Sequence, residues 1–420
     1  MEKYNLIVAG GGFSGVAAAI GAARGGLKVL LIEKGNCFGG ASVTGLVNPF
    51  MPFWTKSVDG EQKRMYLSEG IFREILNGLA EGGALGQNEM TFDEEYLKLL
   101  LNRMIKKAGI TPLFHSYVTN ADITDGKINN ITVSNKSGNI KFSADYYIDA
   151  TGDGDLAACC GFPFKIGRDK DGLCQPMTLC FRLADVDMEV FARSRSMINP
   201  LYKELKEQGI IKNIREDVLY FYTLTDGIVH FNSTRIIKKN PVSAFDVTEA
   251  EIDAREQVFE LHNFLKERVD GFQNSRLIMT APQIGVRESR KIEGEYILTG
   301  DDLVVCTKFD DAIAAGNYDI DIHNPEGSGT SHYYFKDGQF YTIPYRSLIP
   351  KGSKNLLVAG RCISTTHEAQ ASIRIMPIVC CIGEAAGTAI SVACKSKADV
   401  KDANVAEIQD ILRKNNAFIG

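Results

Sequence analysis

The chain has 420 residues, of which 45% are hydrophobic and 24% charged, and its formal net charge is -5. This composition is ordinary for a globular chain of roughly two to three domains, and the dispersed charge predicts neither a nucleic-acid partner nor an anionic membrane surface. No uninterrupted apolar run reaches the roughly 18–20 residues of a membrane-spanning helix, and no signal-peptide pattern precedes the first strand, so we expect a cytoplasmic protein.

The N-terminal segment predicts a buried strand followed by a glycine turn and a helix. Residues 4–9 read YNLIVA, and the next residues, GGGFSG, lead into an alanine-rich helix at 16–24. In this G-x-G-x-x-G turn, Gly10 permits the tight bend, Gly12 lets a pyrophosphate approach the backbone, and Gly15 lets helix and strand pack closely. The free N–H groups of the first helical turn then face the phosphate.

A second predicted strand, residues 28–32, ends at Glu33 and completes a βαβ unit. A carboxylate at this place accepts hydrogen bonds from the hydroxyls of an adenosine ribose and disfavours the extra phosphate of NADP. A glycine turn alone also occurs without any ligand. The strand, helix, second strand and terminal acid together predict a dinucleotide site, with NAD and FAD as the alternatives.

Residues 34–45 discriminate between these two dinucleotides. They read KGNCFGGASVTG, with a second glycine pair, Gly39-Gly40, followed closely by Ser42. This pattern resembles the glutathione-reductase-like flavoprotein superfamily, in which an extended FAD passes this loop. The resemblance implies FAD as the cofactor, bound non-covalently.

Two later segments resemble the same superfamily. The stretch 107–120 resembles the strand that places a residue against adenine, here Val118, and 121–142 alternates as a small antiparallel meander does. Residues 146–160 (YYIDATGDGDLAACC) predict a buried strand ending in an ATG turn at 150–152, which in these flavoproteins lies beside the pyrophosphate and adenosine.

The first strand is nearly repeated at 355–359 (NLLVA), which predicts another strand of the same sheet. A turn at Gly360-Arg361 and a long helix of small residues, about 377–394, follow it. In the flavoproteins that this resembles, the N-terminus of that helix faces the flavin. Many members carry an acid where this chain has Arg361.

The run NLLVAGRCISTTHEAQASIRIMP and most other segments are similar to a narrower group, FAD-dependent oxidoreductases like the flavin-carrying subunit of heterodisulfide reductase. Larger relatives carry iron–sulfur ligands, but that cysteine spacing does not occur here, so we predict no metal site. The resemblance implies these FAD-binding residues: Gly10, Gly12, Phe13, Ser14, Gly15, Glu33, Lys34, Gly39, Gly40, Ala41, Ser42, Val118, Ala150, Thr151, Gly152, Gly360, Arg361 and Met376.

The predicted fold class is α/β. We expect a Rossmann-like FAD-binding domain with a parallel central sheet, formed by residues 1–169 and 341–420, with helices at 65–80 and 93–107 in a cap region at 48–106. Residues 170–340 are expected to form an inserted α+β substrate domain with an antiparallel sheet over the flavin.

Candidate proton-handling residues are His367, His323 and Tyr345. His367 lies in STTHEAQ, between the last strand and the flavin helix, and His323 lies in DIDIHNPEG. For each histidine a structural hydrogen bond is the alternative interpretation.

Candidate anion-binding residues are Arg235, Arg287, Arg290 and Arg374, because arginine forms forked hydrogen bonds with carboxylates. They point to a carboxylate or polyhydroxyl substrate. The alternatives are a salt-bridge lattice of Arg287, Glu288 and Arg290, and a loop contact for Arg374.

These features predict an FAD-dependent oxidoreductase that transfers a hydride between flavin N5 and a small soluble substrate. Because no second G-x-G-x-x-G occurs, we expect no internal NAD(P)H domain. The alternatives are an FAD-bearing electron-relay subunit that docks an iron–sulfur or other redox partner protein, and an FAD-dependent nucleic-acid modifier, against which the lack of a basic stripe weighs. A homodimer remains open.

Overall fold

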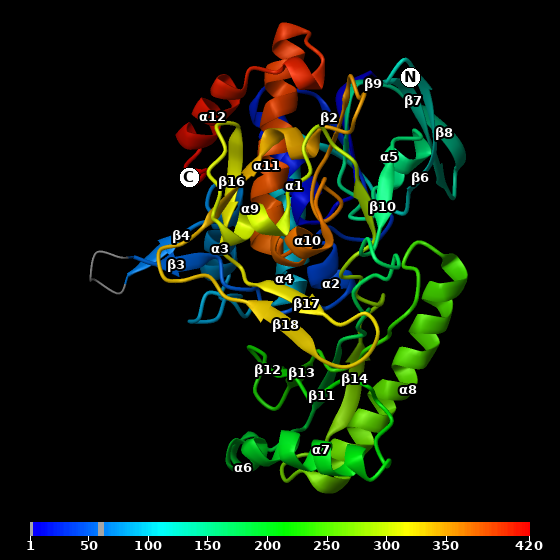
Figure 1. Ribbon diagram of the computed structural model, residues 1–420, viewed down its shortest axis with the longest axis vertical. Helices are drawn as coiled ribbons and strands as arrows, with labels where there is room; N and C mark the ends of the chain where they lie inside the picture. The colour runs from blue at the N-terminus through cyan, green and yellow to red at the C-terminus, as the bar shows by residue number, and fades with distance from the viewer. Residues whose placement is uncertain (1–2, 58–62) are drawn as a thin grey trace.

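The computed structural model describes residues 3–57 and 63–420, and its larger unit is built on a five-stranded parallel sheet (Figure 1). The strand order is β20-β9-β1-β2-β5. The strands are β1 (Tyr4–Ala9), β2 (Val29–Ile32), β5 (Thr111–Leu113), β9 (Ala144–Asp149) and β20 (Leu356–Val358). The strands read as apolar runs because most are covered on both faces. The predicted return of the chain to the first sheet is confirmed, with β9 between the two similar strands.

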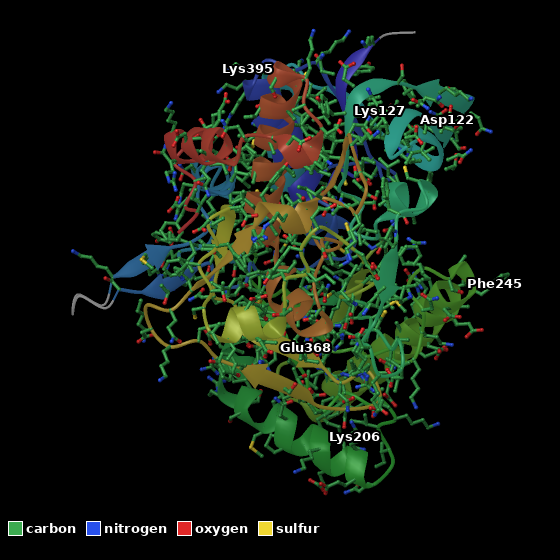
Figure 2. The ribbon with its side chains drawn as sticks, turned by 45° about the horizontal axis from the view of Figure 1, so that its top comes forward. Asp122, Lys127, Lys206, Phe245, Glu368 and Lys395 are labelled. Atoms are coloured by element: carbon green, nitrogen blue, oxygen red, sulfur yellow. The ribbon has the colours of Figure 1, made fainter. Side chains whose placement is uncertain are left out.

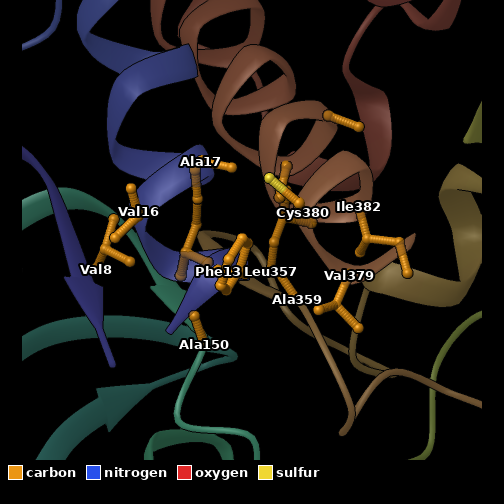
Figure 3. Close-up of a cluster of buried hydrophobic side chains, with 14 of the residues drawn as sticks. Val8, Phe13, Val16, Ala17, Ala150, Leu357, Ala359, Val379, Cys380 and Ile382 are labelled. Carbon is orange, nitrogen blue, oxygen red and sulfur yellow. The ribbon is translucent and has the colours of Figure 1, made fainter. Parts of the chain in front are cut away.

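Two helices of small residues pack on this sheet and on each other: α1 (Phe13–Arg24) and α11 (Met376–Ser396). A Cβ on Gly383 would lie 2.7 Å from the carbonyl carbon of Ser14, and one on Gly387 would lie 2.8 Å from that of Ala18. The glycines therefore let the two backbones touch. Figure 3 shows side chains of both helices meeting strand residues in this core, which we call the first core.

By length and composition α11 could cross a membrane, which we did not expect of any segment from the sequence. In the structure, however, 94% of its most apolar window is buried inside the protein. Its apolar character is thus used in the first core.

The predicted meander is confirmed as an antiparallel three-stranded sheet. It consists of β6 (Tyr117–Thr124), β7 (Lys127–Asn135) and β8 (Gly138–Phe142). The region 48–106 contains the two expected helices, α3 (Ile71–Glu81) and α4 (Glu94–Lys107), and a hairpin that the sequence did not indicate, β3 (Trp54–Lys56) with β4 (Arg64–Tyr66). Both helices contribute side chains to the first core.

The smaller unit, at the bottom of Figure 1, has its own hydrophobic core, the second core. An antiparallel sheet of order β12-β13-β11-β14 carries it. Its elements are β11 (Phe181–Ala184), α6 (Met188–Ser194), α7 (Ile198–Glu207), β12 (Tyr220–Tyr222), β13 (Val229–Phe231), α8 (Ala244–Arg268) and β14 (Arg276–Thr280). Figure 2 shows Phe245 projecting outward from the first turn of α8, whereas Ala254 and Val258 of this helix lie in the second core.

The second core ends at Ile284, well before the predicted boundary at residue 340. Ile292, Leu298 and Ile313 pack in the first core instead, so the segment after 290 returns to the larger unit. The reason is strand pairing. β16 (Ala312–Gly316) is hydrogen-bonded to β19 (Tyr341–Pro344), and β15 (Arg290–Ile292) to β10 (Phe164–Ile166).

The remaining elements complete the larger unit. They are α2 (Ala41–Thr44), α5 (Asp155–Cys159), β10 (Phe164–Ile166), β15 (Arg290–Ile292), α9 (Gly300–Val304), β16 (Ala312–Gly316), β17 (Ile320–His323), β18 (Thr330–Tyr333), β19 (Tyr341–Pro344), α10 (His367–Ile373) and α12 (Val405–Lys414).

Candidate active site

The two glycine loops lie in direct backbone contact. The N–H of Gly39 donates to the carbonyl oxygen of Gly11 at 2.9 Å, and a Cβ on Gly40 would lie 2.9 Å from the Cα of Gly12. A Cβ on Gly15 would lie 2.9 Å from the carbonyl carbon of Gly10 and closer still to its oxygen. Larger residues would force these segments apart. Gly12 differs, because the only neighbour of its Cβ position is the Cα of Gly40, at 3.8 Å.

Glu33 is buried at the end of β2 and is held by the turn that it faces. Its two carboxylate oxygens accept from the N–H of Gly11 at 2.6 Å and from the N–H of Gly35 at 2.7 Å. Glu33 also lines a pocket with four other residues that the sequence predicted to hold the dinucleotide: Gly10, Lys34, Val118 and Thr151. The structure therefore brings the predicted adenosine-side residues together.

The ATG turn is tied to the same place. Asp149, fully buried, accepts from the backbone N–H and the hydroxyl of Thr151, and burial raises the pKa of Asp149 to about 6. Arg361 donates to the carbonyl oxygens of Gly152 and Val286 and forms an ion pair with Asp153. Arg361 thus joins the β20 turn to the ATG turn and to the segment that leads out of the second core.

The predicted residues of the inner loops lie in the same area, some with their side chains engaged by protein. The Ser42 hydroxyl, fully buried, donates to Gly39. The Phe13 ring packs edge-on against Phe50, with 5.6 Å between centroids. A Cβ on Gly360 would lie 3.2 Å from the Cβ of Ser14, so the β20 turn abuts the start of α1.

The two glycine loops, Glu33 and the ATG turn at 150–152 form one site, which we call the cradle. The cradle fits an extended dinucleotide. Among the described residues, the hydroxyl of Ser14 is buried without a hydrogen-bond partner in the first turn of α1. No side chain caps the N-terminus of α1 at Gly12 or that of α11 at Ile375. Two uncapped helix ends and a bare glycine turn offer N–H groups and positive dipole ends to phosphate or to another anionic group.

Close to the N-terminus of α11 lies a second cluster, of buried and partly buried polar side chains, which we call the polar seam. It joins α10 to β17 and to the segment 287–291, at the junction of the two units where Figure 1 shows α10 and β17. Figure 2 marks the place of α10 by the exposed Glu368, whereas most other side chains of this helix are buried. The polar seam consists of Gln175, Arg287, Glu288, Lys291, Asp321, His323, His367, Gln370 and Arg374.

One half of the polar seam is a histidine held by a carboxylate. Glu288, with no exposed surface, faces Nδ1 of His367 at 2.9 Å and accepts from the ammonium of Lys291 at 2.6 Å. Although burial disfavours its charge, the bond with His367 and the charge of Lys291 lower the pKa of Glu288. Nε2 of His367 is buried without a partner among the described residues. The pair leaves one ring nitrogen free to exchange a proton.

The other half centres on Asp321. Its Oδ2 lies 3.3 Å from Nε2 of His323 and 3.5 Å from Nη2 of Arg374. Burial opposes its charge, but the bond with His323 and the charge of Arg374 hold the pKa of Asp321 below its usual range. Burial, together with the charge of Arg287, lowers the pKa of His323 to about 3. His323 is therefore a neutral ring with both nitrogens engaged, Nδ1 facing Arg235 at 3.2 Å, which suits a positioning residue better than a proton carrier.

Gln175 connects the two halves. Its backbone N–H donates to the carboxylate of Glu288 at 3.0 Å, and its side-chain oxygen accepts from the backbone N–H of His323 at 3.3 Å. Its amide nitrogen donates to Gln370, which donates in turn to the carbonyl oxygen of Arg287 at 2.7 Å. The polar seam is thus one continuous hydrogen-bonded network.

Two predicted residues lie outside this network. Arg290 pairs with Asp155 at 2.8 Å and donates to the carbonyl oxygen of Asp153, which is the salt-bridge alternative. The hydroxyl of Tyr345, which is 1% exposed, donates to the carbonyl oxygen of Val400, beyond the C-terminal end of α11. Because α11 has 21 residues, its two ends lie about 30 Å apart. Tyr345 is a core residue remote from the polar seam.

Sequence reasoning singled out neither Asp321, Gln175 nor Gln370, and treated Glu288 only as part of a salt-bridge lattice. The available signal was an acid within the apolar alternation of DIDIH, which is typical of a buried carboxylate that needs a partner. The glutamines carry no such signal, because their role depends on segments far apart in the chain.

A model of the family described as "FAD dependent oxidoreductase" matches residues 5–412. No curated protein matches the chain. Similar solved structures include a geranylgeranyl bacteriochlorophyll reductase-like protein from Thermoplasma acidophilum, at 13% identity and TM-score 0.48, over 99% of this chain and 84% of that one. The p-nitrophenol 4-monooxygenase PnpA from Pseudomonas putida DLL-E4 is similar at 12% identity and TM-score 0.48, over 100% and 87%. The flavin-dependent brominase Bmp2 is similar at 11% identity and TM-score 0.46, over 99% and 84%.

Proposed function

This chain belongs to the FAD dependent oxidoreductase family, and from that membership we propose that it is an enzyme that transfers a hydride between its FAD and a small soluble substrate held at the polar seam. FAD is the cofactor, and when bound it accepts or donates the hydride. The glycine loops, Glu33 and the pocket around Val118 are proposed to hold it. The protein's own part is to bind the substrate, exclude water and move one proton.

The observation that carries this proposal is the position of the polar seam. α10 ends at Ile373, and α11 begins at Met376, so Arg374 of the polar seam lies two positions before the helix end that is proposed to face the flavin. Ligand sites occur preferentially where structural units meet, with a few convergent polar groups that orient the ligand. The polar seam supplies such groups.

His367 is the proposed proton carrier. Glu288 accepts from Nδ1–H, which leaves Nε2 as the nitrogen that takes a proton from a substrate hydroxyl or amine, or returns it. Glu288 therefore acts as a positioning residue. Asp321, which also pairs with His323, holds Arg374. Arg287 is held by the hydroxyl of Thr178 and the carbonyl oxygen of Pro176.

The narrower similarity, to the flavin-carrying subunit of heterodisulfide reductase, and a cytoplasmic location are proposed on sequence grounds only. An FAD-bearing electron-relay subunit that docks a redox partner protein is the second candidate function. The burial of His367 and Glu288 favours a small substrate, because a docked protein could not reach these side chains.

The test is anaerobic reduction of the FAD-loaded protein by a panel of alcohols, amines and acids, followed by the loss of flavin absorbance. We expect a compound that bleaches the flavin, and we expect His367→Gln to slow the bleaching on the order of a hundredfold or more at unchanged FAD content. His262→Gln is the matched control, because His262 lies on α8, outside the polar seam, and its ring hydrogen-bonds Ser275. Bleaching by a reduced iron–sulfur protein but by no small compound would instead support the relay. Equal rates in the two variants would remove His367 from the mechanism.

A further inference from the structure

The polar seam and the residues next to it hold more positive than negative charge. Arg287, Arg374, Lys291 and the neighbouring Arg235 are cationic, whereas the carboxylates that face them are Asp321, Glu288 and Glu216. Lys291 is balanced by Glu288 at 2.6 Å, Arg235 by Glu216 at 3.2 Å, and Arg374 by Asp321 at 3.5 Å. Arg287 is the cation left over.

The Arg287 guanidinium has no carboxylate within ion-pair distance among residues 3–57 and 63–420. Its bonds run to the carbonyl oxygen of Pro176 at 2.7 Å, to the hydroxyl of Thr178 and to Asn232, all of them neutral groups. Burial, reinforced by the charges of Arg374 and Arg215, lowers the pKa of Arg287 to about 9, so it stays charged at neutral pH. A buried charge without a counter-charge is costly. An anionic group beside Arg287 would remove that cost.

Arg374 offers the donor for such a group. Its side chain is 10% exposed, its Nη2 donates to the carbonyl oxygen of Asp321 at 3.2 Å, and its Nη1 is buried without a partner in the part of the chain that the structure describes. His367 is the first residue of α10, and Arg374, seven positions later, directly follows its last residue. Because seven residues make about two helical turns, the two residues lie on the same side, about 10 Å apart along the helix axis. Nε2 of His367 is likewise unpartnered among the described residues, so an arginine donor and a free imidazole nitrogen flank α10 on one side.

We propose that the substrate carries a carboxylate, and that Arg374 and Arg287 bind this group while Nε2 of His367 meets the hydroxyl or amine that exchanges a proton. This inference rests on the proposed function, and it narrows the substrate to an acid. Each planar guanidinium group can donate two hydrogen bonds to a carboxylate. The ion pair with Asp321 holds the Arg374 side chain in position. A neutral isostere would leave Arg287 without its counter-charge.

The test uses FAD-loaded protein, so that the cofactor's own phosphates occupy their site, and measures binding by calorimetry at constant ionic strength. The probes are lactate, lactamide and inorganic phosphate. We expect lactate to bind at least about tenfold more tightly than lactamide. Equal binding of the two, no binding of lactate, or tighter binding of phosphate than of lactate would overturn the proposal.

The variants separate this site from general electrostatics. Arg374→Gln is expected to weaken lactate binding on the order of tenfold to a hundredfold and to leave lactamide unchanged, and Arg374→Lys to retain part of the affinity. The control is Arg255→Gln, an exposed arginine on α8. Unchanged lactate affinity in Arg374→Gln, with a melting temperature equal to that of the parent protein, would refute the assignment. The proposed function is tested separately by flavin bleaching: lactate binding without bleaching by any compound would retain the carboxylate site and reject the hydride transfer.

Discussion

Two alanine substitutions in one turn should separate cofactor binding from folding. At Gly15, a methyl group would lie 2.9 Å from the carbonyl carbon of Gly10 and 3.3 Å from the Cβ of Ala150. Both neighbours belong to the central sheet or its turns, so the start of α1 must move away. We expect Gly15→Ala to lower the free energy of unfolding of the FAD-free protein by about 1–3 kcal/mol or more.

At Gly12 the same methyl group meets only the Cα of Gly40, at 3.8 Å, which is ordinary contact. Its φ of -69° suits alanine as well as glycine. We therefore expect Gly12→Ala to change the stability of the FAD-free protein by less than about 1 kcal/mol. The methyl group would, however, stand where the turn is open to the pyrophosphate, so FAD affinity should fall on the order of tenfold to a hundredfold.

The assay pairs urea unfolding of the FAD-free proteins with FAD titration followed by flavin fluorescence. A ligand stabilises the folded state more, at a given concentration, the lower its Kd. The same concentration of FAD should therefore raise the melting temperature of the parent more than that of Gly12→Ala. The reasoning is refuted if Gly12→Ala binds FAD as tightly as the parent does, or if it destabilises the FAD-free protein as much as Gly15→Ala does.

Three further changes test the packing and charge of the cradle. Gly387→Ala should lower the free energy of unfolding, measured in urea, by about 2 kcal/mol or more, because its methyl group would overlap the backbone of Ala18. Unchanged stability would show that α1 and α11 can move apart at little cost in free energy. Glu33→Gln should weaken FAD binding about tenfold in the same titration, because an amide cannot accept from both backbone N–H groups; equal affinity would contradict this role. Burial raises the pKa of Glu384 from 4.5 to about 7. Between these two pH values the folded state keeps a proton on Glu384 that the unfolded state has lost, so the free energy of unfolding falls as pH rises from 4.5 to about 7. Glu384→Gln should therefore gain up to about 3 kcal/mol at about pH 8 and little at about pH 5, with Glu95→Gln as an exposed control; equal effects at both pH values would contradict the linkage.

The cradle was predictable because its requirements are local. A glycine where backbone meets backbone, an apolar run of strand length and an acid at the strand end are properties of consecutive residues. Glu33 and Gly39 therefore take their predicted places beside the first turn. The meander and α11 follow for the same reason, since alternation and small-residue spacing are periodic signals.

The substrate side was only partly predictable because its residues gain their roles from distant segments. His367 and Glu288 lie 79 residues apart in the chain, and nothing in either local sequence shows that they share a hydrogen bond. Tyr345 looked equally suitable in the sequence, but packing placed its hydroxyl on Val400. The observed boundary of the second unit differs from the predicted one, residue 340, for a similar reason. Strand pairing returns the segment after 290 to the first core.

The sequence by itself determined the dinucleotide turn and the parallel sheet that supports it, because glycine geometry and strand periodicity act over a few residues. Its resemblance to known flavoproteins indicated FAD as the cofactor. Only the tertiary structure decided which polar side chains form the polar seam. Burial and charge pairing join α10, β17 and the segment around Arg287, and those terms exist only once the chain has folded.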